Sequence, residues 1–307
     1  MMQINELLQL GEPDIHGGIA IFPVYPRRRP LATFCTLDQA LELGLQVREV
    51  DEWGSVPVLL VDNPLEHNVL LYDSEGLTGA KQDRVLNLSV LVAAGTTVHV
   101  PVSCVEQGRW HRRSWTFGSS GHTAHPSLRR CKGLALQKSP LAPGVAQRAV
   151  WKEVDRTTAA LDIESPTRAL SDSFHTLEAM LDEHAQFFPL KQGQSGALLA
   201  FDTDLCLDYV SRPDAFQNLW PKVLRGYLLD AIGAIDSPPP NPVVASRFAT
   251  MLANADIERT ASAGIGEDVR LHGDEVFGRG LELQGELLQL SAFRCGRLSG
   301  IGSDLAA

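Results

Sequence analysis

Two short polar stretches hold the side chains of this 307-residue chain that are best suited to chemistry. One reads "GAKQDRVLN" (residues 79–87) and the other reads "PVSCVEQGRW" (residues 101–110). Each combines cationic groups, which can clamp an anion, with carboxylates, which can act as a general base or bind a divalent cation. The candidate residues are Lys81, Gln82, Asp83, Arg84, Glu106 and Arg109, together with Glu75 just before the first stretch.

Both polar stretches lie at the ends of predicted β-strands. Four runs rich in Val, Leu and Thr, with turn residues between them and no helical pattern, cover residues 56–63, 68–75, 84–93 and 96–106. This spacing predicts an antiparallel sandwich or meander, and Pro101 within the last run predicts an edge strand or a bulge there. In an antiparallel sheet, the segment before one strand and the segment after the next lie at the same end. We therefore expect the two stretches to face one pocket.

In this pocket Glu106 is the predicted catalytic acid or base, with Glu75 in reserve. The residues predicted to hold the anion are Lys81, Gln82, Arg84, Arg109, Arg112 and Arg113. A structural alternative stays open, in which Arg84 and Arg109 only pair with neighbouring carboxylates and fix the loop ends. Cys104 has the chemistry of a nucleophile, but its place in an alternating strand favours a buried, inert thiol.

Positive charge is unevenly distributed along the chain. Residues 107–152 contain no acidic residue but nine of the 27 lysines and arginines. The nine are Arg109, Arg112, Arg113, Arg129, Arg130, Lys132, Lys138, Arg148 and Lys152. This segment is either a solvated basic surface or an anion site to which the backbone N–H groups of "FGSSGH" contribute. The net charge of −10 disfavours general nucleic-acid binding.

The histidines and cysteines do not form a complete metal or redox motif. His122 and His125 have the spacing of a ligand pair, but no third ligand lies nearby in the sequence. The five cysteines are odd in number and contain no CxxC pair, which argues against a disulfide framework. The fingerprints of Rossmann, P-loop and α/β-hydrolase sites are also missing. We therefore predict no metal, and the sequence leaves any cofactor unknown.

The composition is that of an ordinary soluble globular protein, with 44% hydrophobic and 21% charged residues. No apolar run approaches the roughly 20 residues that a membrane-spanning helix needs. The N-terminal residues lack the basic and apolar regions of a signal peptide. We therefore expect a cytoplasmic protein that does not contact membranes.

The chain is long enough for more than one core, and its pattern changes along its length. We expect an α+β fold, in which an antiparallel β-sandwich-like N-terminal part is followed by a helix-rich α+β part. The predicted parts are 1–135, mainly antiparallel β with a basic loop at 107–132; 136–236, helical and α+β; and 237–307, a C-terminal α+β extension after the Pro-rich "SPPPNP". Helices are expected within 144–161 and 165–188, and a hairpin at 196–213. Three strand-like runs after residue 266 either form a separate unit or complete a sheet begun by that hairpin.

Longer motifs in the chain match the pattern of a known family. The matching positions are Gly79, Ala80, Lys81, Gln82, Arg84, Cys104, Glu106, Gly108, Arg109 and Trp110, with further matches at 15–24, 125–130, 165–167 and 219–232. On these motifs the chain resembles the ADP-ribosylglycohydrolase and rhodanese-phosphatase associated protein domain family over about residues 11–232. It departs from the pattern at Asp83, where the family usually has Asn, and at 74–76, where Ser-Glu-Gly replaces Gly-Glu-Glu. The added negative charge disfavours a phosphate contact at position 83.

The resemblance implies a link to the processing of ADP-ribose and NAD-derived metabolites, with enzymes of that metabolism as partners, but it implies no reaction. With the basic segment, it predicts binding of a phosphorylated or ADP-ribosyl, NAD-derived small molecule. If the protein is an enzyme, it is then a hydrolase or transferase acting on that molecule. The alternative is a non-enzymatic interaction module that docks a partner through a β-sandwich surface.

Overall fold

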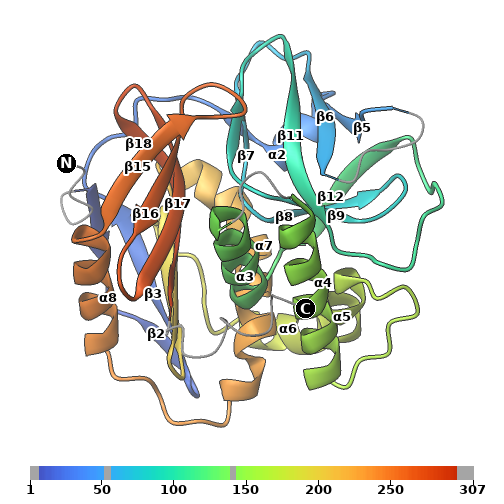
Figure 1. Ribbon diagram of the computed structural model, residues 1–307. Coiled ribbons are helices and arrows are strands. Elements are labelled where there is room, and N and C mark those ends of the chain that lie inside the picture. The colour runs from blue at the N-terminus through green and yellow to red at the C-terminus, as the bar shows by residue number, and fades with distance from the viewer. Residues whose placement is uncertain (1–6, 52–56, 139–142, 296–307) are drawn as a thin grey trace.

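The computed structural model describes residues 7–51, 57–138 and 143–295. It contains a closed β-barrel, a large antiparallel sheet and a group of helices that lie largely between them (Figure 1). All barrel strands come from residues 46–123, whereas the large sheet combines strands from the two ends and the middle of the chain. The expected α+β class with antiparallel sheets is confirmed.

Six strands close into the barrel in the order β11, β6, β5, β12, β8, β9. Their bounds are β5 (Gln46–Glu49), β6 (Val58–Asn63), β8 (Glu75–Gly79), β9 (Arg84–Leu86), β11 (Thr96–Cys104) and β12 (Thr116–Thr123). Inward side chains such as Val47, Val61 and Val100 form one apolar cluster. Because each strand alternates inward and outward residues, closure lets short strands share one core. The expected sandwich is therefore not confirmed, and a barrel takes its place.

The barrel closes partly because β11 changes its partner along its length. Its residues 96–101 pair with β6, and its residues 102–104 pair with β9. Pro101 stands at this change of partner. A residue that lacks an N–H donor is best tolerated where a regular ladder is interrupted. The proline thus marks a switch between two strands, not a free edge.

A three-stranded sheet separates the barrel core from the central core of the protein. It consists of β10 (Val90–Val92), β7 (Val69–Leu71) and β4 (Cys35–Thr36). Val69 and Leu71 pack into the barrel cluster, whereas Leu70 between them packs into the central cluster. This is the alternation expected of a strand that is buried on both faces. Helix α2 (Leu37–Glu42) follows β4 and begins with a capping box between Thr36 and Gln39.

The large sheet has the strand order β1, β3, β13, β14, β18, β17, β16, β15, and β2 pairs with β3. The bounds are β1 (Leu8–Leu10), β2 (Asp14–His16), β3 (Ile19–Pro26), β13 (Gly196–Phe201), β14 (Asp204–Val210), β15 (Asp256–Ala261), β16 (Glu267–His272), β17 (Val276–Leu283) and β18 (Glu286–Arg294). The predicted hairpin is confirmed as β13 and β14. Because β18 pairs with β14, the C-terminal strands complete the sheet that this hairpin begins.

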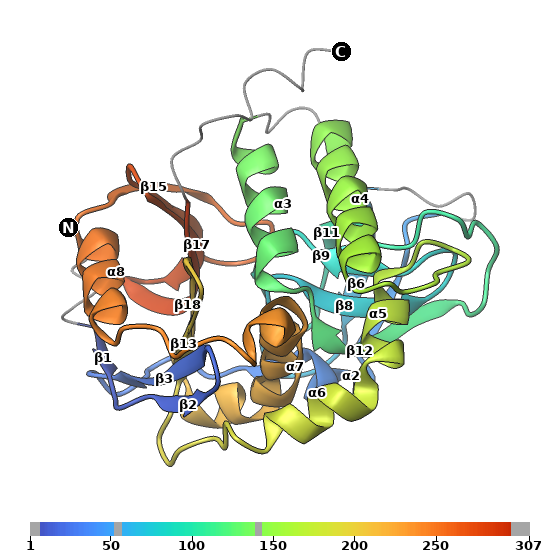
Figure 2. The ribbon, with the colours of Figure 1, turned by 90° about the horizontal axis from the view of Figure 1, so that it is seen from below.

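Helices cover both faces of the large sheet (Figure 2). Helix α7 (Pro213–Ala231), continued by the 3-10 turn η1 (Ile232–Ala234), packs in the central core, and α8 (Val243–Ala253) packs on the opposite face. The other helices are α3 (Pro126–Lys138), α4 (Pro143–Ala160), α5 (Leu170–Thr176) and α6 (Glu178–Ala185). The region predicted as helical at 165–188 thus contains two short helices that meet at Leu177. Within the described ranges, every helix is too short or too polar to cross a membrane.

A buried polar cluster around Asp208 of β14 ties the sheet to the helices. The carboxylate accepts two hydrogen bonds from Arg129 of α3, at 2.6 and 2.7 Å. It also accepts hydrogen bonds from Tyr227 of α7 and Ser291 of β18, both at 2.7 Å, and from Tyr72. Burial alone raises the pKa of Asp208, but the charge and hydrogen bonds of Arg129 outweigh burial and keep this pKa below its usual value. The ionised carboxylate therefore holds three layers of the fold together.

Candidate functional site

The two polar stretches meet at one end of the barrel, as antiparallel pairing predicts. Arg84 opens β9 and Cys104 closes β11, and these two residues are paired. One residue further along, the N–H of Val105 donates to the carbonyl of Asp83 at 3.0 Å. The polar residues that precede β9 therefore lie beside those that follow β11.

The guanidinium of Arg109 is completely buried at this junction and uses all of its nitrogens inside the protein. Nε donates to both oxygens of Glu106 at 2.8 Å. Nη1 donates to the carbonyls of Ala80 and His111, and Nη2 donates to Asp83 and the carbonyl of Gly79, all at 2.9–3.2 Å. An arginine with this set of partners has no donor left for a ligand. Its contacts match the structural alternative, in which it locks the two loop ends together.

Glu106 and Asp83 share this one guanidinium. Glu106 also accepts the N–H of Asp83 at 3.1 Å. Burial raises the pKa of Glu106, but hydrogen bonds from Arg109 and from the Asp83 N–H outweigh it and hold the pKa below its usual value. Burial, and then the charge of Glu106, raise the pKa of Asp83. Glu106 is thus held ionised by bonds that a general acid or base would have to break.

Arg84 points into the barrel and has different partners from Arg109. Its Nη1 donates to Gln82 at 2.8 Å and contacts the thiol of Cys104, while its Nη2 lies 3.9 Å from a carboxylate oxygen of Glu49. Burial raises the pKa of Cys104 to about 11, against the opposing effect of Arg84. The thiol is therefore protonated at neutral pH, as the buried-thiol interpretation requires.

Glu75, the reserve catalytic residue, belongs to a separate buried network. It accepts hydrogen bonds from Lys222 of α7 at 2.8 Å and from the N–H of Tyr72 at 2.9 Å. Lys222 also donates to Asp38 at 2.6 Å. Burial raises the pKa of Glu75, and Lys222 partly offsets this effect. These contacts join β8 to α7 and α2, and none of them reaches Glu106.

The remaining predicted residues lie at the surface of the same barrel end. We call Lys81, Trp110, Arg112, Arg113 and Trp115 the aromatic–basic rim. Trp110 and Trp115 are 50% and 74% exposed, and the side chain of Arg113 is 57% exposed. Lys81 lies 5.5 Å from the ring centre of Trp110, and Arg112 lies 3.9 Å from that of Trp115. The rim therefore combines exposed aromatic faces with cations that stack on them.

The histidine pair of the basic loop is split between two environments. The ring of His122 stacks on Phe174 with the ring centres 3.7 Å apart. His125 instead forms a hydrogen bond with Thr157 at 3.0 Å and lies 3.8 Å from Glu153. No group of three or more His, Cys, Asp or Glu side chains among the described residues could hold a metal.

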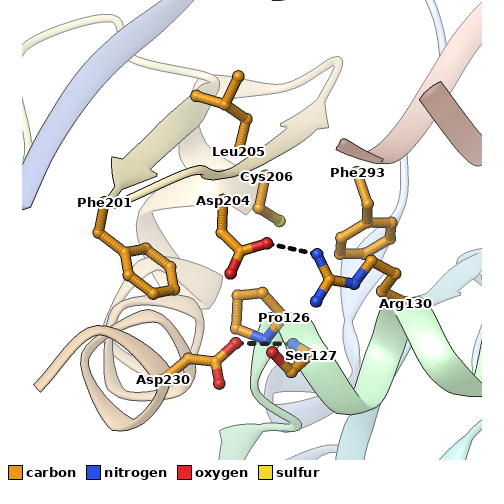
Figure 3. A pocket seen from close by; sticks show the side chains of 9 residues that line it. All are labelled: Pro126, Ser127, Arg130, Phe201, Asp204, Leu205, Cys206, Asp230 and Phe293. Atoms are coloured by element: carbon orange, nitrogen blue, oxygen red, sulfur yellow. Dashed lines mark hydrogen bonds and ion pairs between the residues drawn. The ribbon is translucent and has the colours of Figure 1, made fainter. Parts of the chain in front are cut away.

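Two of the cavities among the described residues lie elsewhere, and no predicted site residue lines these two. The smaller has a volume of about 10 Å³, roughly the room for one water, and lies beside the ion pair of Arg130 and Asp204 (Figure 3). At its floor Asp230 accepts the N–H of Ser127 at 2.7 Å, at the start of α3. The larger cavity, about 340 Å³, lies between α3 and strands β16 and β17.

Sequence analysis missed three members of this barrel end. Trp110 was seen only as a motif position, Trp115 was not considered, and Glu49 was not considered either. Their signals are weak but present. The two tryptophans flank a pair of arginines, and Glu49 follows Val47 at the next inward position of a short strand.

Replacing Arg109 by lysine should lower the free energy of unfolding by about 2 kcal/mol. Lysine keeps the charge but has no planar fork, so several carbonyl and carboxylate oxygens would lose their partner. Urea unfolding followed by circular dichroism measures the change. The matched control is Arg113→Lys on the same loop, which should change stability by less than about 0.5 kcal/mol because Arg113 is exposed. Equal effects of the two variants would contradict the structural role of Arg109.

Comparison with known proteins gives one family match. The model of the ARG and Rhodanese-Phosphatase-superfamily-associated Protein domain matches residues 7–293. No curated protein and no solved structure matches the chain. The family match confirms the resemblance carried by the motifs. It also extends that resemblance beyond residue 232 into β18, so the C-terminal strands lie inside the matched region.

Proposed function

The chain belongs to the ARG and Rhodanese-Phosphatase-superfamily-associated Protein domain family, and from that premise we propose that it binds a phosphorylated or ADP-ribosyl small molecule on the aromatic–basic rim. The family name associates these proteins with ADP-ribose-related enzymes. An NAD-derived metabolite has both of the groups that such a rim is suited to hold, namely phosphates and planar rings.

The observation that carries this proposal is the composition of the rim. Exposed tryptophans offer faces on which a base can stack, and arginines form charge-assisted hydrogen bonds to phosphate. Apart from Lys81, the rim lies in a segment of the chain, residues 107–152, that contains no acidic residue. An anion that approaches this loop therefore meets no carboxylate from the loop itself.

The buried residues then act as supports. Arg109 and Glu106 fix the loop from which Trp110, Arg112 and Arg113 project. Arg84 lies 5.9 Å from the ring centre of Trp110 and supports it from the barrel side. Because the carboxylates of Glu106 and Glu75 are both engaged, we assign them positioning roles, and the proposal covers binding without a chemical step.

Arg113→Ala should weaken the binding of pyrophosphate and of ADP-ribose by about tenfold. A hydrogen bond to a charged group contributes roughly 1.5–3 kcal/mol, and about 1.4 kcal/mol corresponds to a factor of ten in affinity. Isothermal titration calorimetry of both proteins measures the change. Arg247→Ala is the control and should leave affinity unchanged, because Arg247 is exposed on α8, a helix that lies across the large sheet from the barrel (Figure 1). Equal affinities for the Arg113 and Arg247 variants would remove the rim from the site.

The second candidate function is a non-enzymatic docking module, which the exposure of Trp110 and Trp115 favours. The two functions differ in a simple measurement. A small-molecule site predicts a rise in melting temperature with ADP-ribose, NAD, AMP or pyrophosphate, because a ligand of the native state stabilises it. A docking module predicts no rise with any of the four.

A further inference from the structure

The apolar interior of the barrel ends in a charged layer. On three barrel strands, an inward apolar residue is followed, two positions nearer the rim, by an inward polar one. These pairs are Val47 and Glu49 on β5, Leu86 and Arg84 on β9, and Val102 and Cys104 on β11. The three apolar residues belong to the barrel cluster. Residues two apart on a strand point to the same side. Glu49, Arg84 and Cys104 therefore share the barrel interior at the end where the rim lies.

Glu49 and Arg84 are buried but do not satisfy each other. Within the part of the chain that the structure describes, both carboxylate oxygens of Glu49, and Nε and Nη2 of Arg84, have no hydrogen-bond partner. The closest approach of the two groups, Nη2 to Oε1, is 3.9 Å, which is too long for a hydrogen bond. Their side chains are only 5% and 0% exposed. Buried polar groups normally have partners, so these unpaired donors and acceptors are placed to hold a bound molecule.

The vacant atoms define the chemistry of that molecule. A carboxylate only accepts hydrogen bonds, and a guanidinium only donates them. A molecule that satisfies both must carry an N–H donor beside an acceptor atom on one edge. The amino group and N1 of adenine form such an edge, and so does the carboxamide of nicotinamide. Trp110 lies over Arg84 and is half exposed, so it covers this end of the barrel and provides a face on which a flat ring can stack.

We propose that Glu49 and Arg84 bind the donor–acceptor edge of a planar nitrogen heterocycle at the barrel end. This inference rests on the proposed function, because the heterocycle would belong to the molecule whose phosphates the rim holds. Gln82 and Cys104 hold Nη1 of Arg84, which leaves Nε and Nη2 for the ligand. The ring reaches the buried pair by displacing Trp110.

The test uses probes that separate the two parts of the ligand. Adenosine and nicotinamide carry an edge without phosphate, and pyrophosphate carries phosphate without an edge. Isothermal titration calorimetry should show saturable binding of adenosine or of nicotinamide to the native protein, since each carries the edge that Glu49 and Arg84 would hold. The probe that binds identifies adenine or nicotinamide as the source of the edge.

Variants then locate the contact. Glu49→Gln should weaken the binding of that probe about tenfold, because a charged acceptor becomes neutral, and should leave pyrophosphate affinity unchanged. The matched control is Arg48→Gln, since Arg48 is the preceding residue of β5 and is exposed on the outer side.

The outcomes distinguish this inference from the proposed function. Absence of binding of both uncharged probes overturns the inference, while pyrophosphate binding alone would still support the rim. Binding of an uncharged probe without pyrophosphate binding supports the barrel-end site and removes the rim. A Glu49→Gln variant that binds the probe as the native protein does also overturns the inference.

Discussion

Asp208→Ala should lower the free energy of unfolding by about 3–5 kcal/mol, the cost typical of breaking a buried ion pair by removal of one partner. The side chains of Asp208 and Arg129 are both 0% exposed. The carboxylate accepts two hydrogen bonds from Arg129 and one each from Tyr72, Tyr227 and Ser291. Without it, the guanidinium stays buried with no opposite charge, and two tyrosine hydroxyls lose their acceptor.

Urea unfolding followed by tryptophan fluorescence measures this loss, and β14 offers a matched control. Asp204 begins the same strand and pairs with Arg130, but the two side chains are 34% and 29% exposed. Asp204→Ala should therefore cost less than about 1 kcal/mol, as solvated ion pairs usually do. A second replacement, Arg129→Met in the Asp208→Ala protein, should recover part of the stability because it removes the unpaired charge. Equal losses for the two aspartates would show that the buried cluster does not hold the layers together.

Local features of this fold could be predicted from the sequence because they depend on neighbouring residues. Runs rich in Val, Leu and Thr between turn residues identified β6 and β11, and the predicted turn Asp202-Thr203-Asp204 identified the hairpin of β13 and β14. Antiparallel pairing then placed residues 79–87 beside residues 101–110, and the structure confirms this contact. These steps need only strand periodicity and one topological rule.

The barrel could not be predicted because its closure depends on strands with weak patterns. Strand β5 has four residues, and β12 reads "TFGSSGHT", which has the composition of a loop. Yet β12 pairs with both β5 and β8, with an irregular register between Ser119 and Thr123. Without these two pairings, the same strands suggest an open sandwich. Tertiary packing, not intrinsic propensity, makes β12 a strand.

The residue types of the candidate site could be predicted, but their hydrogen-bonding state could not. Arg109 is saturated largely by main-chain carbonyls, including those of Gly79 and Ala80. These two residues adopt positive φ angles of 119° and 38°, which turn their carbonyls in a direction that no side-chain pattern reveals. Sequence therefore identified a cationic cluster, and only coordinates separate its buried supports from its exposed rim.

The largest pH effect that we expect comes from His122, which is buried between the barrel and α5. Burial, together with the positive charges of Arg225 and Lys222, lowers the pKa of His122 from 6.5 to about 3. In the unfolded chain the ring takes up a proton below about pH 6.5, whereas in the native protein it stays neutral until about pH 3. The unfolded state thus binds more protons in this window, so stability falls as pH falls through it. From pH 7 to pH 4, this one group should cost about 3 kcal/mol.

His122→Phe tests this expectation, because phenylalanine keeps the stacking on Phe174 and cannot be protonated. The measured quantity is the difference in unfolding free energy between pH 7 and pH 4. That difference should be about 3 kcal/mol smaller in the variant than in the native protein. Comparing each protein with itself removes any change in packing, and carboxylates such as Glu153, whose pKa is lowered to about 2, contribute equally to both proteins.

His99→Gln is the control, since the exposed ring of His99 on β11 meets solvent in the native protein, and it should leave the difference unchanged. If His122→Phe also leaves it unchanged, His122 is not the group whose protonation weakens the protein in acid.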